Sequence, residues 1–219
     1  MFSFDSSDLS ELKKENNASR VINVMGLIWK SLISASKKTN GFQKTSVLSI
    51  SVNLRTKASP PLKDFSMGNI IWFATARFEP ENELGLSSII ACLQDSIAEI
   101  DAHFVEGLKG DEGSAKMVER LRKLQEEVYS DEDNAEYYCV SSWCNLGFLE
   151  VDFGFGKPSR ILHGCPDSEN PGVANMILLN DSGCGDGIEA LVSVCEDYMM
   201  IIEEDDELLR FASNNNLST

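Results

Sequence analysis

Apolar residues recur at intervals of three or four positions in the first long segment of the chain, a spacing typical of a helix with one buried face. From Ser19 to Lys38 the stripe comprises Val21, Met25, Ile28 and Leu32, flanked by Ile22, Trp29 and Ile33. Lysines gather at its end, and Asn40-Gly41 follows. We therefore predict a buried amphipathic helix over 19–38, stopped at the glycine.

Similar patterns predict the remaining elements. Helical spacing occurs over residues 5–15, 86–108, 111–128 and 203–211. In the helix over 111–128 we expect the apolar residues to face inward, namely Met117, Leu121, Leu124 and Val128. Runs rich in β-branched and aromatic residues predict strands over 45–55, 69–78, 137–142, 147–153, 173–179 and 187–194.

These elements indicate an α/β fold, with a mixed β-sheet and helices packed on it. Residues 130–136 form an acidic link and residues 158–172 a long loop, and no internal repeat occurs. A chain of 219 residues, 42% of them hydrophobic, has material for one sizeable core. We therefore treat residues 1–219 as a single domain.

Charge is strongly negative overall and unevenly distributed. The formal net charge of −16 argues against nucleic acid and anionic membranes as partners. Ten Lys and Arg residues and only two Glu residues lie between Glu11 and Lys63, so this segment carries a net +8. A basic segment in an acidic protein is a candidate anion-binding face. The alternative is a solvated, lysine-rich helix surface.

Cysteine spacing and the chain start bear on the compartment. The six cysteines stand at 92, 139, 144, 165, 184 and 195 without a Cys-x-x-Cys pair, which predicts reduced thiols and no metal site. The opening residues have neither a basic nor an apolar targeting region, and no run of about eighteen apolar residues occurs. We expect a cytoplasmic protein.

The most specific motif is an aromatic segment punctuated by glycines. Gly154 and Gly156 permit backbone angles closed to other residues, and Pro158 prevents continued central pairing. Asp152 stands just before them, where a carboxylate can accept backbone N–H bonds. We predict a strand over 147–153 that ends in a tight corner held by Asp152, which is a structural role.

This segment resembles the Asp-Phe-Gly-Trp-Gly signature of the plant acyl-CoA-dependent acyltransferases called the BAHD family, with Phe155 replacing the tryptophan. A second similar block is Asn53-Leu54-Arg55, followed by Pro60-Pro61. With weaker similarities at 19–30 and 185–190, the resemblance covers nearly the whole chain, in the manner of the vinorine-synthase-like branch. It implies a chloramphenicol-acetyltransferase-like two-layer sandwich, and it matches only the C-terminal one of the two family domains.

The resemblance also implies roles for individual residues. Asn53 and Arg55 occupy the positions where the family's arginine pairs with the aspartate of the catalytic His-x-x-x-Asp motif across the domain interface; the alternative is a surface arginine at a strand end. The structural corner comprises Asp152, Phe153, Gly154, Phe155 and Gly156. Ser19 and Arg20 are candidate coenzyme A contacts, and residues 159–162 are candidates for lining the acyl or acceptor pocket.

One histidine has the residue spacing of the family's catalytic motif. His163 and Asp167 have the His-x-x-x-Asp spacing, but they follow the glycine corner, whereas the family's motif precedes it. Pro166 places this histidine in a loop, and the only other histidine, His103, lies on a predicted helix. We reject His163 as a general base, and we assign no catalytic residue in this sequence. No serine elbow or nucleotide-binding fingerprint occurs either.

The function implied by the resemblance is acyl transfer from a CoA thioester to an alcohol or amine of a plant specialised metabolite. Acyl-CoA would be a co-substrate, with no bound cofactor. Because the histidine base belongs to the other half of the family fold, we expect this truncated chain to be inactive alone. We also expect it to associate with such a half or with itself. The alternative is a non-catalytic CoA-binding or regulatory module.

Overall fold

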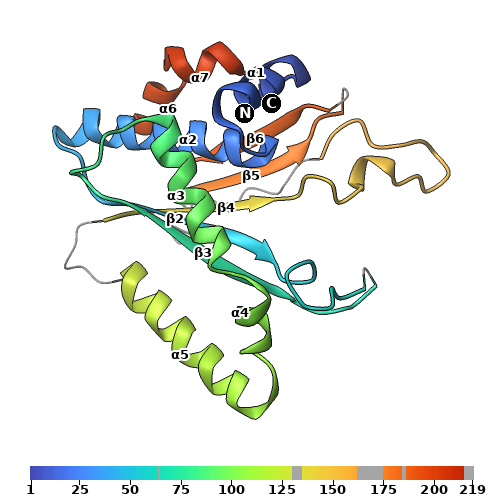
Figure 1. Cartoon of the computed structure of the whole chain (residues 1–219). Helices are drawn as coiled ribbons and strands as arrows, with labels where there is room; N and C mark the ends of the chain where they lie inside the picture. Colours follow the sequence, from blue (N-terminus) through green and yellow to red (C-terminus); the bar gives the residue numbers. More distant parts are fainter. Residues whose placement is uncertain (64, 130–134, 162–174, 184–185, 215–219) are drawn as a thin grey trace.

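A seven-stranded mixed sheet runs through the molecule (Figure 1). The computed structural model describes the chain except at residues 64, 130–134, 162–174, 184–185 and 215–219. The strand order is β3-β2-β4-β5-β6-β1-β7. Pairs β2/β4 and β4/β5 are parallel, and the others are antiparallel. The strands are β1 (Phe2–Phe4), β2 (Ser46–Asn53), β3 (Ile71–Phe78), β4 (Glu136–Ser142), β5 (Met176–Asp181), β6 (Ile188–Ser193) and β7 (Ser213–Asn214).

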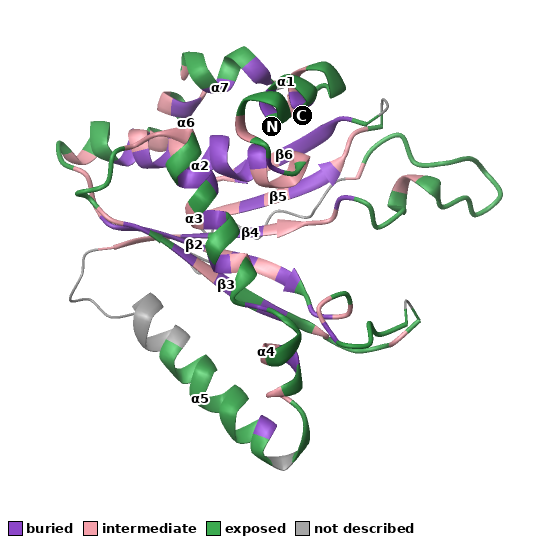
Figure 2. Ribbon diagram, viewed as in Figure 1, coloured by how far each residue is buried: buried purple, intermediate pink, exposed green. Residues whose placement is uncertain are grey.

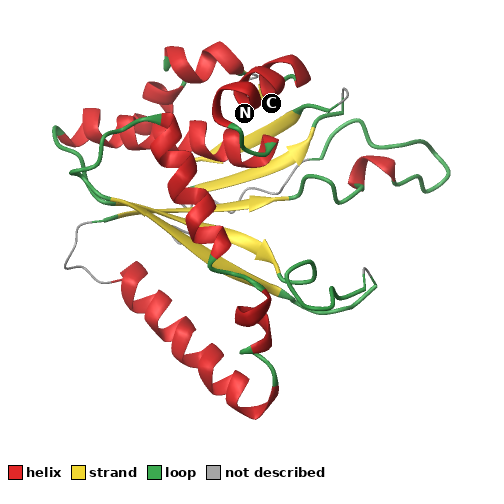
Figure 3. Ribbon diagram, in the orientation of Figure 1, coloured by secondary structure: helices red, strands yellow, loops and turns green. Residues whose placement is uncertain are grey.

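Helices cover one side of this sheet (Figure 3). They are α1 (Ser6–Asn16), α2 (Arg20–Asn40), α3 (Leu86–Ala98), α6 (Glu196–Ile202) and α7 (Asp206–Phe211). Helix α2 is central to this layer, because it contacts α1, α3, α6 and α7. Two further helices, α4 (Ala102–Glu106) and α5 (Gly110–Tyr129), lie near the β3 edge. The predicted mixed sheet with packed helices is confirmed.

The long helix α2 forms as its sequence pattern predicts. The Ser19 hydroxyl accepts the Ile22 N–H at 3.2 Å and caps the first turn. Gly41 ends the helix with φ 79°, a left-handed conformation that glycine adopts without strain. Ile28 and Trp29 are fully buried, and the Trp29 Nε1–H donates to Ser46 Oγ at 2.9 Å. The helix is therefore attached to β2 by both packing and a buried hydrogen bond.

The strand predicted over 147–153 is wrong. Gly147 has φ 73°, and residues Phe148–Glu150 form a single 3-10 turn. The loop leaves the sheet after β4, so its β-prone residues pair with none of the described strands. Phe153 and Phe155 are 79% and 88% exposed. Propensity favoured a strand, but strand formation needs a partner in the sheet.

Capping aspartates change the bounds of two predicted helices. The helix predicted over 86–108 breaks after α3, and Asp101 Oδ1 accepts the Phe104 N–H at 2.8 Å to start α4. The C-terminal helix predicted over 203–211 starts later, as α7, because Asp205 Oδ1 accepts N–H bonds from Glu207 and Leu208; helix α6, which precedes it, was not predicted. An aspartate inside an apolar periodic run can therefore mark a new helix start.

Helix α5 differs from its prediction in burial. Met117 and Leu121, which we expected to face inward, are 37% and 43% exposed, and Figure 2 shows the described part of α5 as mostly exposed. Most of the predicted loops at 130–136 and 158–172 lies outside the described residues. Within the described part of the chain, no helix is long and apolar enough to cross a membrane.

Candidate functional site

Three strands end at the same edge of the sheet. Because β2, β4 and β5 are mutually parallel, their last residues, Asn53, Ser142 and Asp181, lie along one edge, which we name the carboxyl edge. The loop after β2 carries Arg55, and the loop after β4 carries the Asp152 corner. The two blocks that resemble the acyltransferase family are about 90 residues apart in sequence, and the parallel pairing brings them to one edge.

Away from the helix layer, the sheet presents a second face, which we name the open face. Strand residues alternate between the two sides, so Leu48, Ile50 and Val52 of β2 are buried beneath the helices. Ser49 and Ser51 alternate with them and are only half-buried. On β4, Cys139 is exposed and Ser141 half-buried on the same open face. Its central positions are therefore small and polar rather than core-forming.

The Arg55 guanidinium organises its own loop. Its Nη2 donates to the carbonyls of Ser66 and Gly68 at 2.8 Å each, and its Nε donates to Ser66 at 3.1 Å. The Asn53 side-chain oxygen accepts the Arg55 N–H at 3.0 Å. Arg55 is half-buried, and these bonds close the loop over residues 54–70. In this arrangement the arginine fixes a loop at the carboxyl edge, two residues beyond the end of β2.

The Asp152 corner is held as its sequence predicts. Asp152 Oδ1 accepts the N–H groups of Gly154 at 2.7 Å and Gly156 at 3.1 Å. Both glycines have positive φ, 99° and 108°, so side chains at these positions would strain the turn. The rings of Phe153 and Phe155 stack with centroids 6.3 Å apart. The Phe155 ring points to solvent, with only Phe153 against it among the described contacts.

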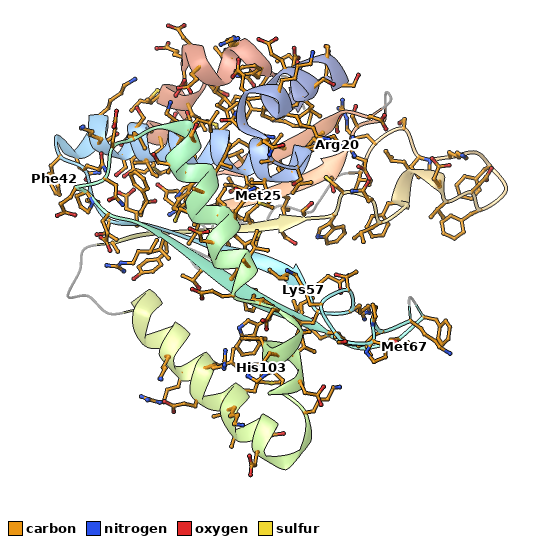
Figure 4. The ribbon with its side chains drawn as sticks, viewed as in Figure 1. Arg20, Met25, Phe42, Lys57, Met67 and His103 are labelled. Atoms are coloured by element: carbon orange, nitrogen blue, oxygen red, sulfur yellow. The ribbon has the colours of Figure 1, made fainter. Side chains whose placement is uncertain are left out.

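A polar network joins the start of α2 to the loop after β4. The Arg20 guanidinium donates to the Asp186 carbonyl and lies 3.5 Å from Asn145 Oδ1. The Asn145 N–H donates to Asp181 Oδ2 at 2.7 Å, and Asn145 has φ 61°. Figure 4 shows Arg20 at this edge, beside the strands. Sequence reasoning missed Asn145 and Asp181, although an asparagine two residues before Gly147 was an available turn signal.

Ser19 and Arg20, our candidate coenzyme A contacts, therefore lie at the carboxyl edge. Ser19 caps α2, and it is exposed. Further along the basic segment, Lys30 pairs with Glu207, and Lys44 lies 3.4 Å from Glu136. Part of the positive charge between residues 11 and 63 is thus neutralised inside the fold, and Arg20 remains the basic residue placed at the edge by the start of α2.

Thiol chemistry is disfavoured at this edge. Burial raises the pKa of the Cys144 thiol, which is the cysteine closest in sequence to the corner. A raised pKa leaves the thiol protonated near neutral pH, and the protonated form is a poor nucleophile. His163, which we rejected as a base, lies outside the described residues. His103 lies on α4, beside β3 rather than in the loops of the carboxyl edge.

Known proteins share this sequence and fold. The model of the Transferase family matches residues 6–209. The chain is 35% identical to limonoid 7-O-acetyltransferase of Citrus sinensis over 222 residues, covering 97% of this chain and 48% of that protein. Vinorine synthase of Rauvolfia serpentina is 33% identical over 194 residues, covering 88% of this chain and 41% of that protein. The chain thus spans about half the length of these curated relatives.

Solved structures of other proteins show the same fold. The crystal structure of vinorine synthase superimposes with a TM-score of 0.74 at 29% identity, over 98% of this chain and 47% of that one. The structure of F. sporotrichioides TRI101 with coenzyme A and T-2 has a TM-score of 0.69 at 18% identity, over 97% of this chain and 49% of that one, and it supports the fold alone. The chloramphenicol-acetyltransferase-like sandwich is confirmed. By sequence and by fold, this chain belongs to the Transferase family, the BAHD family that its two motif blocks resemble.

Proposed function

We propose that this chain forms the acyl-CoA-facing half of an acyltransferase that moves an acyl group from a CoA thioester to an alcohol or amine of a plant specialised metabolite. The observation that carries the proposal is that the Arg55 loop and the loop with the Asp152 corner both leave the sheet at its carboxyl edge. The relatives named as acetyltransferases support the reaction class.

In this proposal the chain binds and positions acyl-CoA, and another segment supplies the base. Acyl transfer needs a base that takes the proton of the acceptor hydroxyl or amine as it attacks the thioester carbonyl. The resulting tetrahedral oxyanion collapses with loss of CoA thiolate. Arg20 would attract the CoA phosphates, and the Arg55 loop would shape the wall next to the base. The base itself would come from a segment equivalent to the other half of the relatives.

The test uses a chimera in which the first half of vinorine synthase precedes this chain. We expect release of CoA thiol from acetyl-CoA in the presence of the vinorine synthase acceptor. Arg55→Ala should lower the rate at least about tenfold, because the loop at residues 54–70 loses its central donor. Arg122→Ala, on the distant helix α5, is the matched control and should leave the rate unchanged. A folded chimera that neither binds CoA nor releases thiol would refute the proposal.

The chain alone provides the second arm of this test. Without a positioned base, turnover of acetyl-CoA should not exceed background, since base catalysis and positioning each contribute orders of magnitude. If the chain alone turned over, and His163→Ala abolished the activity, our rejection of that histidine would be wrong. Loss of CoA binding in Arg20→Ala, measured by calorimetry, would support the assigned contact.

A second candidate function is a binding or interaction module, and exposed apolar residues favour it. Phe65 and Met67 in the loop after β2 are 78% and 94% exposed, and Phe153 and Phe155 in the loop after β4 are similarly exposed. Both loops leave the carboxyl edge, and Figure 4 shows Met67 far out on its loop. Exposed apolar side chains at loop tips are typical of a surface that another protein covers. The proposed cover is a family first half or a second copy.

Sedimentation tests this surface directly. The net charge of −16 opposes self-association, and salt screens it with a Debye length of about 8 Å at physiological ionic strength. We therefore expect larger species as salt rises, and fewer of them in a Phe153→Ser, Phe155→Ser variant. The interaction role would be excluded if the chain stayed monomeric at every salt concentration and did not bind a separately produced first half.

A further inference from the structure

A cavity of about 800 Å³ runs along β3, from Trp72 and Phe73 near the carboxyl edge to Arg77 at the other end of the strand. Arg77, Val47 and Tyr137 pair in one row across β3, β2 and β4, and Val47 and Tyr137 are near the amino ends of their strands. Helices α4 and α5 complete the walls; Figure 4 labels His103, the lining residue on α4. None of the carboxyl-edge residues described above lines this cavity.

Aromatic rings from two strands and one helix line the cavity. Trp72 and Phe73 of β3, Phe104 of α4 and Tyr137 of β4 all line it. The rings of Trp72 and Phe104 lie 5.7 Å apart at 58°. Protein cavities that hold small molecules measure about 300–1,000 Å³, and this cavity falls within that range. The size and the walls therefore suit a flat ligand of one or two rings.

Positive charge lies on the α5 side. Arg120 and Lys123 are one helical turn apart and both line the cavity. The Arg120 guanidinium lies 4.3 Å from the centroid of the Phe104 ring, so it is held against the aromatic wall. These two positively charged side chains line the cavity although the chain as a whole has a net charge of −16. Such cations can pair with an anionic group on the ligand.

The other charged lining groups are largely committed within the protein. Arg77 Nε pairs with Glu79 Oε1 at 2.5 Å. Asp101 also lines the cavity, but its Oδ1 accepts the Phe104 N–H and caps α4. Glu99 is the remaining acidic lining residue, and it comes from the end of α3 rather than from α5. The cavity is thus polarised, with its positive side on α5.

We propose that this cavity binds a planar aromatic carboxylate, with its rings packed against the Trp72–Phe104 pair and its carboxylate beside Arg120 and Lys123. The residues that line this cavity are not those assigned to acyl transfer, and the proposed binding needs neither CoA nor a second protein half. A neutral analogue would keep the ring contacts but lose the charge-assisted hydrogen bonds. Discrimination between the charged and neutral forms is therefore the signature of the site.

The experiment uses 2-naphthoate and its neutral counterpart 2-naphthamide, measured by calorimetry on the whole chain. We expect 2-naphthoate to bind at least about tenfold more tightly, the minimum effect of a charge-assisted contact. The double substitution Arg120→Ala, Lys123→Ala should remove that preference. The matched control, Lys116→Ala, Arg122→Ala, also removes two positive charges from α5, but these residues pair with Glu112 and Glu119 and do not line the cavity.

The control double variant should keep 2-naphthoate affinity within about twofold of the parent. Three results would each overturn the proposal. They are equal affinity for the acid and the amide, an equal loss of 2-naphthoate affinity in both double variants, and no binding of 2-naphthoate at millimolar concentration. A Trp72→Leu variant is an independent test, because it removes one aromatic ring from the cavity lining without changing the charge. It should weaken both ligands alike.

Discussion

The helix-covered face of the sheet and the carboxyl edge differ in what their aromatic residues contact. On the helix-covered face, Trp29 and Phe78 are almost fully buried and pack edge to face with ring centroids 6.4 Å apart. At the carboxyl edge, Phe153 and Phe155 also pair, but both rings are largely exposed. Figure 2 shows this contrast as buried strands beneath α2 and exposed loops beyond the strand ends.

This difference separates stability from function within one sheet. A buried ring removes apolar area from water and stabilises the fold. An exposed ring contributes little to folding, so its place at the surface is explained by what it will contact. The helix-covered face is the part that folds the chain, and the open face with its carboxyl edge is the part that can be used. Four substitutions can break or sharpen this contrast.

The largest effect should come from truncating a buried ring. Phe78→Ala should lower the free energy of unfolding by about 3–5 kcal/mol, because it leaves a cavity against Trp29. Phe155→Ala is the matched change at the edge and should stay within about 0.5 kcal/mol of the parent. Urea unfolding followed by circular dichroism measures both. Similar losses in the two variants would show that the edge loop is part of the core.

The next largest effect should come from the tight α2–α3 contact. A Cβ atom added at Gly26 would lie 2.9 Å from Ile90 Cγ1 and 3.6 Å from Ile89 Cγ2. Gly26→Val should therefore cost about 1–3 kcal/mol by overpacking. Gly26→Ala should cost less, since its single methyl is offset by better helix propensity. Thermal unfolding that ranks Val above Ala in stability would contradict the close packing.

A smaller effect should follow from loosening the glycine corner. Asp152→Ala removes the acceptor of two backbone N–H bonds, and because these bonds are exposed the loss of stability should be about 1 kcal/mol or less. Faster hydrogen exchange at Gly154 and Gly156 is the sharper readout. Asp152→Asn keeps a side-chain oxygen and should preserve most of the protection. Equal exchange in all three proteins would mean that the glycines alone hold the turn.

The smallest effect should be that of restoring the family's ring. Phe155→Trp should change the free energy of unfolding by less than about 0.5 kcal/mol, because the ring is 88% exposed and meets no core wall. The same variant in the chimera should raise the CoA-release rate or leave it unchanged. Destabilisation beyond about 2 kcal/mol in the chain alone would reveal packing at this site and weaken the contrast between the faces.

Much of the helix-covered face could be predicted from the sequence. The stripe over 19–38 identified α2, and its stop at Gly41 is the observed C-cap. Five of the six predicted strands correspond to strands of the sheet, because alternating or continuous apolar runs reflect burial on one or both faces. The hydrogen bonds of Asp152 were also predictable, since an aspartate before two glycines acts over a few residues.

Other features could not be predicted, because they depend on distant partners. Whether Phe148 and Phe153 join a strand depends on a neighbouring strand, and none accompanies the loop after β4. The bonds of Arg55 to Ser66 and Gly68 depend on how a whole loop closes. The link between Arg20 and Asn145 joins residues 125 positions apart. The cavity beside α5 depends on where that helix lies relative to β3.

By itself, the sequence determined the order of most elements, the buried stripe of α2, the Asp152 turn and the family, because these features are encoded over short spans or as motifs. Only the tertiary structure decided that both motif blocks lie at one edge, that the other face of the sheet stays open, and that a cavity with a cationic side forms near β3. The physical reason is strand pairing: the parallel alignment of β2, β4 and β5 brings distant loops together, and no local pattern specifies which strands become neighbours.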